Sequence, residues 1–283
     1  MTTVLISGLG LIGSSIARVI HRQNPANEMI GVDPDDDSSR FMLQQHIINR
    51  IDTFNHAAQK ADVIILAGPV SVIISQIEEL ANIKLKPNVL ITDTGSTKAS
   101  VMKAAQSLIK KGVGFLGGHP MAGSHLTGSR SGSLRLLTQS TYFLVNGSQT
   151  QRQLDQFKAL MKPAKINWTL IGAKDHDQLV SELSHVPHVV ATTLVNAAAA
   201  QLQDNPTGLS AAAGGFKDTT RIAAADPTMW TAIMLNNADA IDEGIEAFKT
   251  QLTKLQTAIH NQDEQTILRT FQQAQAIRES LDK

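Results

Sequence analysis

Short apolar runs alternate with amphipathic stretches along the first 170 residues of the chain. The strand-like runs cover residues 4–7, 29–32, 63–67, 89–92, 114–116 and 142–145. The clearest helical stretches between them are residues 12–20 and 98–110. This alternation is typical of βαβ units built around a parallel sheet. We therefore predict an α/β domain over residues 1–170.

The strand-like signal stops near residue 170, and helical periodicity takes its place. An alanine-rich helix is expected over residues 180–203. Further along, apolar residues recur at steps of four and three, as in a helix stripe close to a coiled-coil seam; they are Ile241, Ile245, Phe248, Leu252, Leu255 and Ile259. A second helix is expected to fold back on that stripe, with Ile267, Phe271, Ala274 and Leu281.

These signals predict an all-α domain over residues 171–283. The apolar stripe is either buried within the chain or exposed as a seam between two copies. Roughly 110 helical residues form a thin core on their own, which favours a homodimer.

Composition narrows the class of protein. Of 283 residues, 42% are hydrophobic, which is enough to fill ordinary cores. Twenty-five basic residues balance 25 acidic ones, so neither a nucleic-acid nor a membrane-surface partner is expected. No signal peptide and no apolar run of about 18 residues is evident. The absence of cysteine excludes disulfides and thiolate chemistry and fits the cytoplasm, where we expect this protein.

The N-terminal segment carries a glycine pattern suited to phosphate. Residues 4–14 are VLISGLGLIGS, a strand followed by Gly8, Gly10 and Gly13 at the start of a helix. These glycines permit a tight turn, close approach of a pyrophosphate and helix–strand packing, as in a Rossmann-type domain. Asp33 ends the second strand, where a carboxylate binds ribose hydroxyls and repels a 2′-phosphate, which favours NAD over NADP. The alternative is a packing loop with Asp33 as a turn residue.

The ends of the third and fourth strands belong to the same edge of the predicted sheet. They are AGPV, residues 67–70, and TDTGSTK, residues 92–98. Ligands of open α/β sheets bind beyond the carboxyl ends of the strands, so these turns are expected near the nicotinamide. The predicted cofactor-binding residues are therefore Gly8, Gly10, Leu11, Ile12, Gly13, Asp33, Gly68, Pro69, Asp93 and Gly95.

A histidine follows the next strand, in GGHPMAGS, residues 117–124. At that edge of the sheet, neutral His119 can accept a hydroxyl proton while hydride leaves the same carbon. The alternative is a buried structural histidine. Ser96 either holds this ring or the substrate hydroxyl, or it caps the helix over residues 98–110.

The helical half contains further polar candidates. His185 and His188 flank Pro187, which is expected to bend the helix, with one histidine packed and the other solvated. A metal site would need a third ligand such as His119 or His125, and no HExxH spacing exists, so we expect no metal. From the residues alone, Arg221 either caps a helix or pairs with a nearby aspartate, Asp218 or Asp226.

Five segments in order resemble the prephenate dehydrogenase family of tyrosine biosynthesis: GLGLIGSS, DTGSTK, HPMAGS, SELSHVPH and GGFKDTTRIAAADPTMW. The resemblance spans almost the whole chain. It implies a Rossmann domain followed by a helical dimerisation domain. It also implies the NAD-dependent oxidative decarboxylation of prephenate to 4-hydroxyphenylpyruvate.

The resemblance also implies roles for single residues. His119 would accept the proton of the ring hydroxyl, assisted by Ser96. Arg221 would bind a carboxylate of prephenate, and His188 would make a second substrate contact. Trp230, with Met229, is expected to reach the active site of a partner subunit.

Three other functions stay open on the sequence. The chain could be an arogenate or dual-specificity cyclohexadienyl dehydrogenase. It could be a β-hydroxyacid dehydrogenase, in which Lys174 would be the catalytic lysine. It could also be a nucleotide sensor without chemistry. No chorismate mutase region precedes the first strand and no regulatory βαββαβ segment follows the helices, so feedback by tyrosine through such a domain is not expected.

Overall fold

A computed structural model describes residues 1–123 and 126–281. Ser124, in the GGHPMAGS segment, and His125, considered as a third metal ligand, lie outside the described residues. The chain divides into two compact units, Met1–Asn237 and Ala238–Lys283. The first unit continues past residue 170 because later helices, over 173–180 and 227–236, contact helices that cover the sheet.

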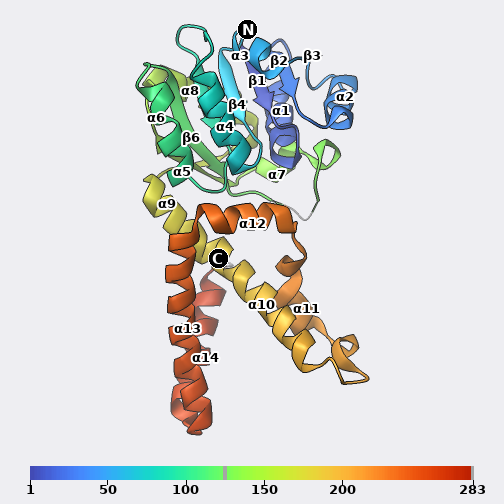
Figure 1. Cartoon of the computed structure of the whole chain (residues 1–283), viewed down its shortest axis with the longest axis vertical. Helices are drawn as coiled ribbons and strands as arrows, with labels where there is room; N and C mark the ends of the chain where they lie inside the picture. The colour runs from blue at the N-terminus through green and yellow to red at the C-terminus, as the bar shows by residue number, and fades with distance from the viewer. Residues whose placement is uncertain (124–125, 282–283) are drawn as a thin grey trace. The chain divides into compact units, whose positions relative to one another are not determined.

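The strands form one mostly parallel sheet in the order β3-β2-β1-β4-β5-β6-β7-β8 (Figure 1). Their bounds are β1 Thr3–Ser7, β2 Glu28–Val32, β3 Arg50–Ile51, β4 Val63–Leu66, β5 Leu90–Asp93, β6 Gly114–Pro120, β7 Thr141–Asn146 and β8 Asn167–Leu170. Among the strands that the structure describes, the β6–β7 pairing alone is antiparallel. The predicted Rossmann-type α/β fold is confirmed, and all six predicted strands are present.

Helices cover both faces of this sheet (Figure 1). Their bounds are α1 Leu11–Gln23, α2 Asp36–Gln44, α3 Phe54–Ala58, α4 Val70–Leu80, α5 Ala99–Ala104, α6 Gln106–Ile109, α7 Leu134–Leu137 and α8 Gln151–Leu160. Along β1, Val4 and Ile6 belong to the core under α1 and α8, whereas Leu5 belongs to the core under α4 and α5. Alternate side chains of a strand point to opposite faces, so each buried strand supplies both cores.

The chain then continues in helices. They are α9 Ala173–Val180, α10 Val186–Gln201, α11 Gly214–Thr220 and α12 Pro227–Asn236, with 3-10 turns at Gly208–Ala211 and Arg221–Ala224. The predicted helix over 180–203 is divided, because Ser181–His185 forms a π-helical turn ahead of Pro187. Proline has no N–H to donate and its ring crowds the preceding turn, which a wider π turn relieves.

A buried ion pair joins the carboxyl end of β5 to the turn that follows it. Lys98 and Asp93 are both fully buried, and the Lys98 Nζ donates to Asp93 and to the Gly118 carbonyl, at 2.8 Å from the latter. The other oxygen of Asp93 accepts from the Gly118 N–H at 3.0 Å. Burial lowers the pKa of Lys98, and Asp93 acts in the opposite direction. The pair therefore holds the backbone of β6 directly before His119.

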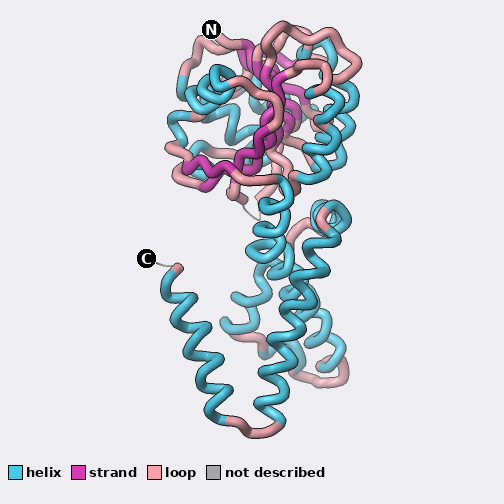
Figure 2. Tube along the Cα trace, turned by 90° about the vertical axis from the view of Figure 1, so that its left-hand side faces the viewer, coloured by secondary structure: helices cyan, strands magenta, loops and turns pink. Residues whose placement is uncertain are grey.

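The second unit is a hairpin of two helices, α13 Ala238–His260 and α14 Glu264–Ser280 (Figure 2). The predicted pair of helices is confirmed, and Asp263 caps the second one by accepting from the Thr266 N–H. Several apolar side chains of the hairpin are exposed: Phe248, Leu252, Ile259, Leu268, Phe271, Ile277 and Leu281. Among the described residues, no helix has the length and apolar content needed to cross a membrane.

The buried ion pair yields a stability prediction. Lys98→Met should lower the free energy of unfolding by about 3–5 kcal/mol, because it leaves the Asp93 carboxylate buried without its cation. Denaturant unfolding of the purified variant measures this change. Lys103→Met is the matched control, since Lys103 lies on the same helix and is exposed. Equal stability of the two variants would contradict the prediction.

Candidate active site

The glycine turn after β1 is crowded at two positions and open at the third. Gly8 has φ +94°, and a Cβ there would lie 2.7 Å from the Ala67 carbonyl carbon. A Cβ at Gly13 would overlap the Gly8 carbonyl oxygen, whereas a Cβ at Gly10 would meet nothing within 4 Å. Gly10 is the N-cap of α1 and provides no side-chain cap, so the first N–H groups of Leu11 and Ile12 face open space. This cradle fits a pyrophosphate.

Asp33 is fixed at the end of β2 with one oxygen toward the glycine turn. It accepts from the Leu9 N–H at 2.5 Å and from the Asp35 N–H at 2.8 Å. Each carboxylate oxygen retains a lone pair, so the group can still accept hydrogen bonds from ribose hydroxyls. The carboxylate is therefore an ordered acceptor that also holds the turn after β2 through the Asp35 N–H.

The other predicted cofactor residues occupy two turns at the carboxyl ends of β4 and β5. Gly68 and Pro69 lead into α4, with Pro69 exposed at its N-cap. Gly95 is buried, and its N–H donates to Asp93 at 2.8 Å. Asp93 differs from the other predicted cofactor residues, because its fully buried carboxylate is occupied by Lys98, Gly95 and Gly118. Its role is to hold the turn.

His119 lies one residue before the end of β6, at the same edge of the sheet. Its Nδ1 is 2.9 Å from the Nε2 of His176 on α9. The Nδ1 of His176 is in turn 2.8 Å from the Asp177 carboxylate. His176 is fully buried, and the ring of Phe143 packs edge-on against it, with the centroids 5.3 Å apart. Three ionisable side chains therefore stand in one hydrogen-bonded line.

The surroundings of His119 keep its imidazole neutral. Burial lowers its pKa well below 6.5, and the neighbouring His176, Lys98 and His185 act in the same direction. A neutral imidazole has one ring nitrogen free to accept a proton. The alternative of a purely structural histidine does not explain why the ring is left partly accessible at the ligand-binding edge of the sheet.

Ser96 does not cap the helix that follows it. The N-cap of α5 is Lys98, without a side-chain cap of its own. Instead, Asp177 accepts from the backbone N–H groups of Lys98 and Ala99, at 2.6 and 2.8 Å. The capping alternative for Ser96 was therefore wrong. Its half-buried side chain makes no hydrogen bond with the residues that the structure describes.

His188 and Trp230 are stacked, with ring centroids 3.4 Å apart and planes at 24°. The His188 Nδ1 donates to the Ser184 carbonyl of the π turn at 2.9 Å, which leaves its Nε2 free. The Trp230 Nε1 is buried and has no partner among the described residues. Trp230, expected at the partner's site, therefore packs on a histidine of its own chain.

Arg221 is exposed at the start of the 3-10 turn after α11. Within the described residues it forms no ion pair, so the pairing with Asp218 or Asp226 was wrong. Burial and the charge of Arg221 both lower the pKa of His188, while the hydrogen bond to Ser184 raises it. The guanidinium is thus an unpaired cation near the stacked rings.

The sequence reasoning missed the residues behind His119. His176, Asp177 and Asn237 are all buried, and the Asn237 Nδ2 contacts the Asp177 carbonyl at 2.9 Å and the His185 Nδ1 at 3.1 Å. Mainly through burial, the pKa of His185 falls to about 4. Lys174, the alternative catalytic lysine, is exposed on the first turn of α9. Among the described ranges, no cluster of His, Cys, Asp or Glu is arranged to hold a metal.

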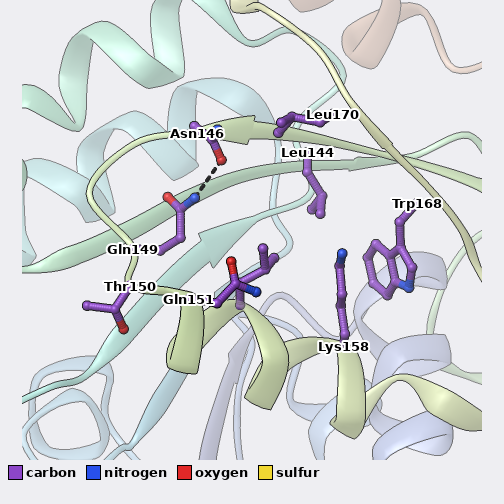
Figure 3. Close-up of a pocket in the computed structure, with 9 residues that line it drawn as sticks. Leu144, Asn146, Gln149, Thr150, Gln151, Lys158, Trp168 and Leu170 are labelled. Atoms are coloured by element: carbon purple, nitrogen blue, oxygen red, sulfur yellow. Dashed lines mark hydrogen bonds between the residues drawn. The ribbon is translucent and has the colours of Figure 1, made fainter.

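A pocket of about 310 Å³ lies elsewhere, between α8 and the strands β7 and β8 (Figure 3). Lys158 and Trp168 stand side by side in it, and Gln149 donates to Asn146 at 2.6 Å. None of the candidate site residues lines this pocket, so it is separate from the site around His119.

Two family models match the chain, and together they span most of it. The nucleotide-binding domain of prephenate dehydrogenase matches residues 16–170, and the prephenate dehydrogenase dimerization domain matches residues 172–273. The chain belongs to the prephenate dehydrogenase family. The prephenate dehydrogenase of Lactococcus lactis subsp. cremoris is 38% identical over 283 residues, 100% of this chain and 78% of that protein.

Two further proteins are similar to this chain over nearly all of its length. The Zymomonas mobilis cyclohexadienyl dehydrogenase is 32% identical over 285 residues, 98% of this chain and 95% of that protein. The crystal structure of Aquifex aeolicus prephenate dehydrogenase, in complex with hydroxyphenyl propionate and NAD+, has a TM-score of 0.91. It is 26% identical and covers 99% of this chain and 98% of that one. The sequence resemblance to this family is confirmed.

The glycine turn generates a prediction that separates binding from folding. Gly10→Ala should leave the melting temperature unchanged but weaken NAD binding at least about tenfold, because the methyl group enters only the cradle. Gly13→Ala is the contrasting variant and should lower both the melting temperature and the affinity for NAD, because its Cβ displaces the turn itself. Calorimetric titration and thermal unfolding measure the two effects. Unchanged NAD affinity in Gly10→Ala would contradict the placement of the phosphates.

Proposed function

We propose that the chain catalyses the NAD-dependent oxidative decarboxylation of prephenate to 4-hydroxyphenylpyruvate. The observation that carries the proposal is His119, a neutral base held at the sheet edge where the glycine turn also ends. Membership of the prephenate dehydrogenase family supports it. The NAD complex of the Aquifex aeolicus enzyme supports the choice of cofactor.

The residues around the glycine turn fit a dinucleotide. The open space at Gly10 would receive the pyrophosphate, and the N–H groups of Leu11 and Ile12 would bind it. Asp33 would bind the ribose hydroxyls and would disfavour a 2′-phosphate by charge repulsion. Gly68, Pro69 and Gly95 would hold the nicotinamide half of the cofactor. NAD, when bound, supplies the acceptor for the hydride that leaves the hydroxyl-bearing carbon of prephenate.

His119 manages the proton of the reaction. Its free ring nitrogen accepts the proton of the ring hydroxyl as the carbon loses its hydride, so the C–O bond becomes a carbonyl. The bond to the ring carboxylate then breaks, carbon dioxide leaves, and its electron pair makes the ring aromatic. The resulting phenolate takes the proton back from His119. Ser96, with no partner of its own among the described residues, orients the hydroxyl.

The carboxylates of prephenate need cationic or donor partners. Arg221 offers a guanidinium fork, which matches a carboxylate better than an ammonium does. Beside it, the free Nε2 of His188 and the unpartnered Nε1 of Trp230 supply further polar contacts. These three residues form the substrate-binding part of the proposal.

Assembly and location complete the proposal. The exposed apolar side chains of the α13–α14 hairpin, Phe248 and Leu252 among them, would be covered in a homodimer. The match of this region to a dimerization domain supports that arrangement. We place the enzyme in the cytoplasm, as its membership of a biosynthetic family suggests.

A second candidate is supported by the Zymomonas mobilis relative, which is a cyclohexadienyl dehydrogenase. In this reading the chain also oxidises arogenate, which carries an amino group where prephenate has a keto group. Both substrates share the hydroxyl and the ring carboxylate, so the roles of His119 and Arg221 would be the same.

The proposal predicts the outcome of an assay in four pairings. Formation of reduced cofactor should be fastest with prephenate and NAD, and slower with arogenate or with NADP. His119→Asn should lower kcat by about 10² or more, as expected when a general base is removed. Equal or faster turnover of arogenate would favour the second candidate, and full activity of His119→Asn would refute the role of the base.

The pH dependence follows from the direction of the pKa shift. His119 acts as a base only when it is neutral, and burial lowers its pKa well below 6.5. As the pH falls, kcat/KM should therefore hold steady through 6.5 and decline only at lower pH. A profile measured between about pH 5 and pH 8 tests this, with thermal unfolding at each pH as the control. A half-loss of kcat/KM near or above 6.5 would show an unshifted base.

A further inference from the structure

The two residues behind His119 have no role in the function proposed so far. His176 is fully buried and cannot meet the substrate, yet it joins the Nδ1 of His119 to the carboxylate of Asp177. Buried polar groups in such a line specify one arrangement when all partners are satisfied. The arrangement here fixes the direction of each hydrogen bond.

The direction starts at Asp177. Its carboxylate receives the backbone N–H groups of Lys98 and Ala99, at 2.6 and 2.8 Å, so it is the acceptor toward His176 as well. His176 therefore carries its proton on Nδ1. As a neutral imidazole it then presents a lone pair at Nε2, which accepts from the Nδ1–H of His119. Of the ring nitrogens in the line, the Nε2 of His119 is the one left with a free lone pair.

We propose that Asp177 and His176 are positioning residues that hold His119 in the tautomer with a free Nε2, the atom that takes the substrate proton. The proposal rests on the function given above and adds the atom and the device that selects it. When Nε2 gains the proton, the Nδ1–H of His119 keeps its hydrogen bond to His176, and His176 keeps its own to Asp177, so the ring stays in place. The same proton leaves Nε2 when the phenolate takes it back.

Asp177 also makes two further sets of contacts that hold the line in place. The Asp177 carboxylate caps α5, which follows the turn held by Lys98 and Asp93. The Asp177 carbonyl accepts from the side chain of Asn237 at 2.9 Å, and Asn237 is the C-cap residue of α12. A purely structural cap would need the contacts to Lys98 and Ala99 but not the histidine between Asp177 and the base.

Variants of His176 separate positioning from structure, since Asp177 variants would also disturb the cap of α5. His176→Leu removes the acceptor and should lower kcat at least about tenfold, with the KM for prephenate and the Kd for NAD unchanged. His176→Gln offers its side-chain oxygen to the His119 Nδ1–H and should restore kcat to within about threefold of the parent. His56→Leu is the matched control, because His56 forms an exposed pair with Asp52 and should not affect kcat.

Two results would overturn the proposal: equal losses of kcat in His176→Leu and His176→Gln, or a change confined to KM. Nitrogen NMR of the resting protein, with labelled histidine, provides a readout that needs no turnover. It should place the protons of His119 and His176 on Nδ1. A proton on the Nε2 of His119 would refute the positioning role even if the parent oxidises prephenate. A parent without prephenate activity would refute the proposed function and leave the tautomer to be decided by the NMR result.

Discussion

Two carboxylates that point into the turn between β5 and α5 are the constraint on which the site depends. Asp93 holds this turn from the sheet, through Lys98, Gly95 and Gly118, and Asp177 holds it from α9 by capping the helix. Both carboxylates are buried, so water cannot take the place of their hydrogen-bond donors. Burying a charge is costly unless it is paired and hydrogen-bonded. Each carboxylate therefore strongly favours the backbone conformation of the turn in which its hydrogen-bond donors are in place. That conformation places His119 at the sheet edge.

Much of the fold could be predicted from the sequence, because it rests on local patterns. Strand cores such as Val63–Leu66 and the amphipathic helix after the glycine turn are visible as runs and periods. Strand β8 was missed because it is largely exposed, and its short run follows no clear alternation. The π turn before Pro187 was foreseen only as a bend, since the sequence places the proline but not the way the neighbouring carbonyls adjust.

The site residues that could be predicted are those whose neighbours in the sequence determine where they lie in the sheet. The glycine turn, Asp33 and His119 follow strand ends, and strand ends of a parallel sheet share an edge. His176 and Asp177 follow no such rule: they lie 57 and more residues from the base, and only the packing of α9 on α5 brings them together. The partnership of Asp93 with Lys98 was also not foreseen, because the sequence shows Lys98 only as the start of a helix.

The cap of α5 comes from a residue 78 positions further along the chain. A helix of six residues has little stability by itself, so its first turn depends on the cap that Asp177 of α9 supplies. The orientation of His119 depends on α9 in the same way, through His176. The nucleotide-binding and dimerization segments of this chain are therefore poorly suited to independent exchange between relatives. A nucleotide-binding segment on its own would keep the glycine turn that fits a pyrophosphate, but it would lose His176 and Asp177, which orient His119.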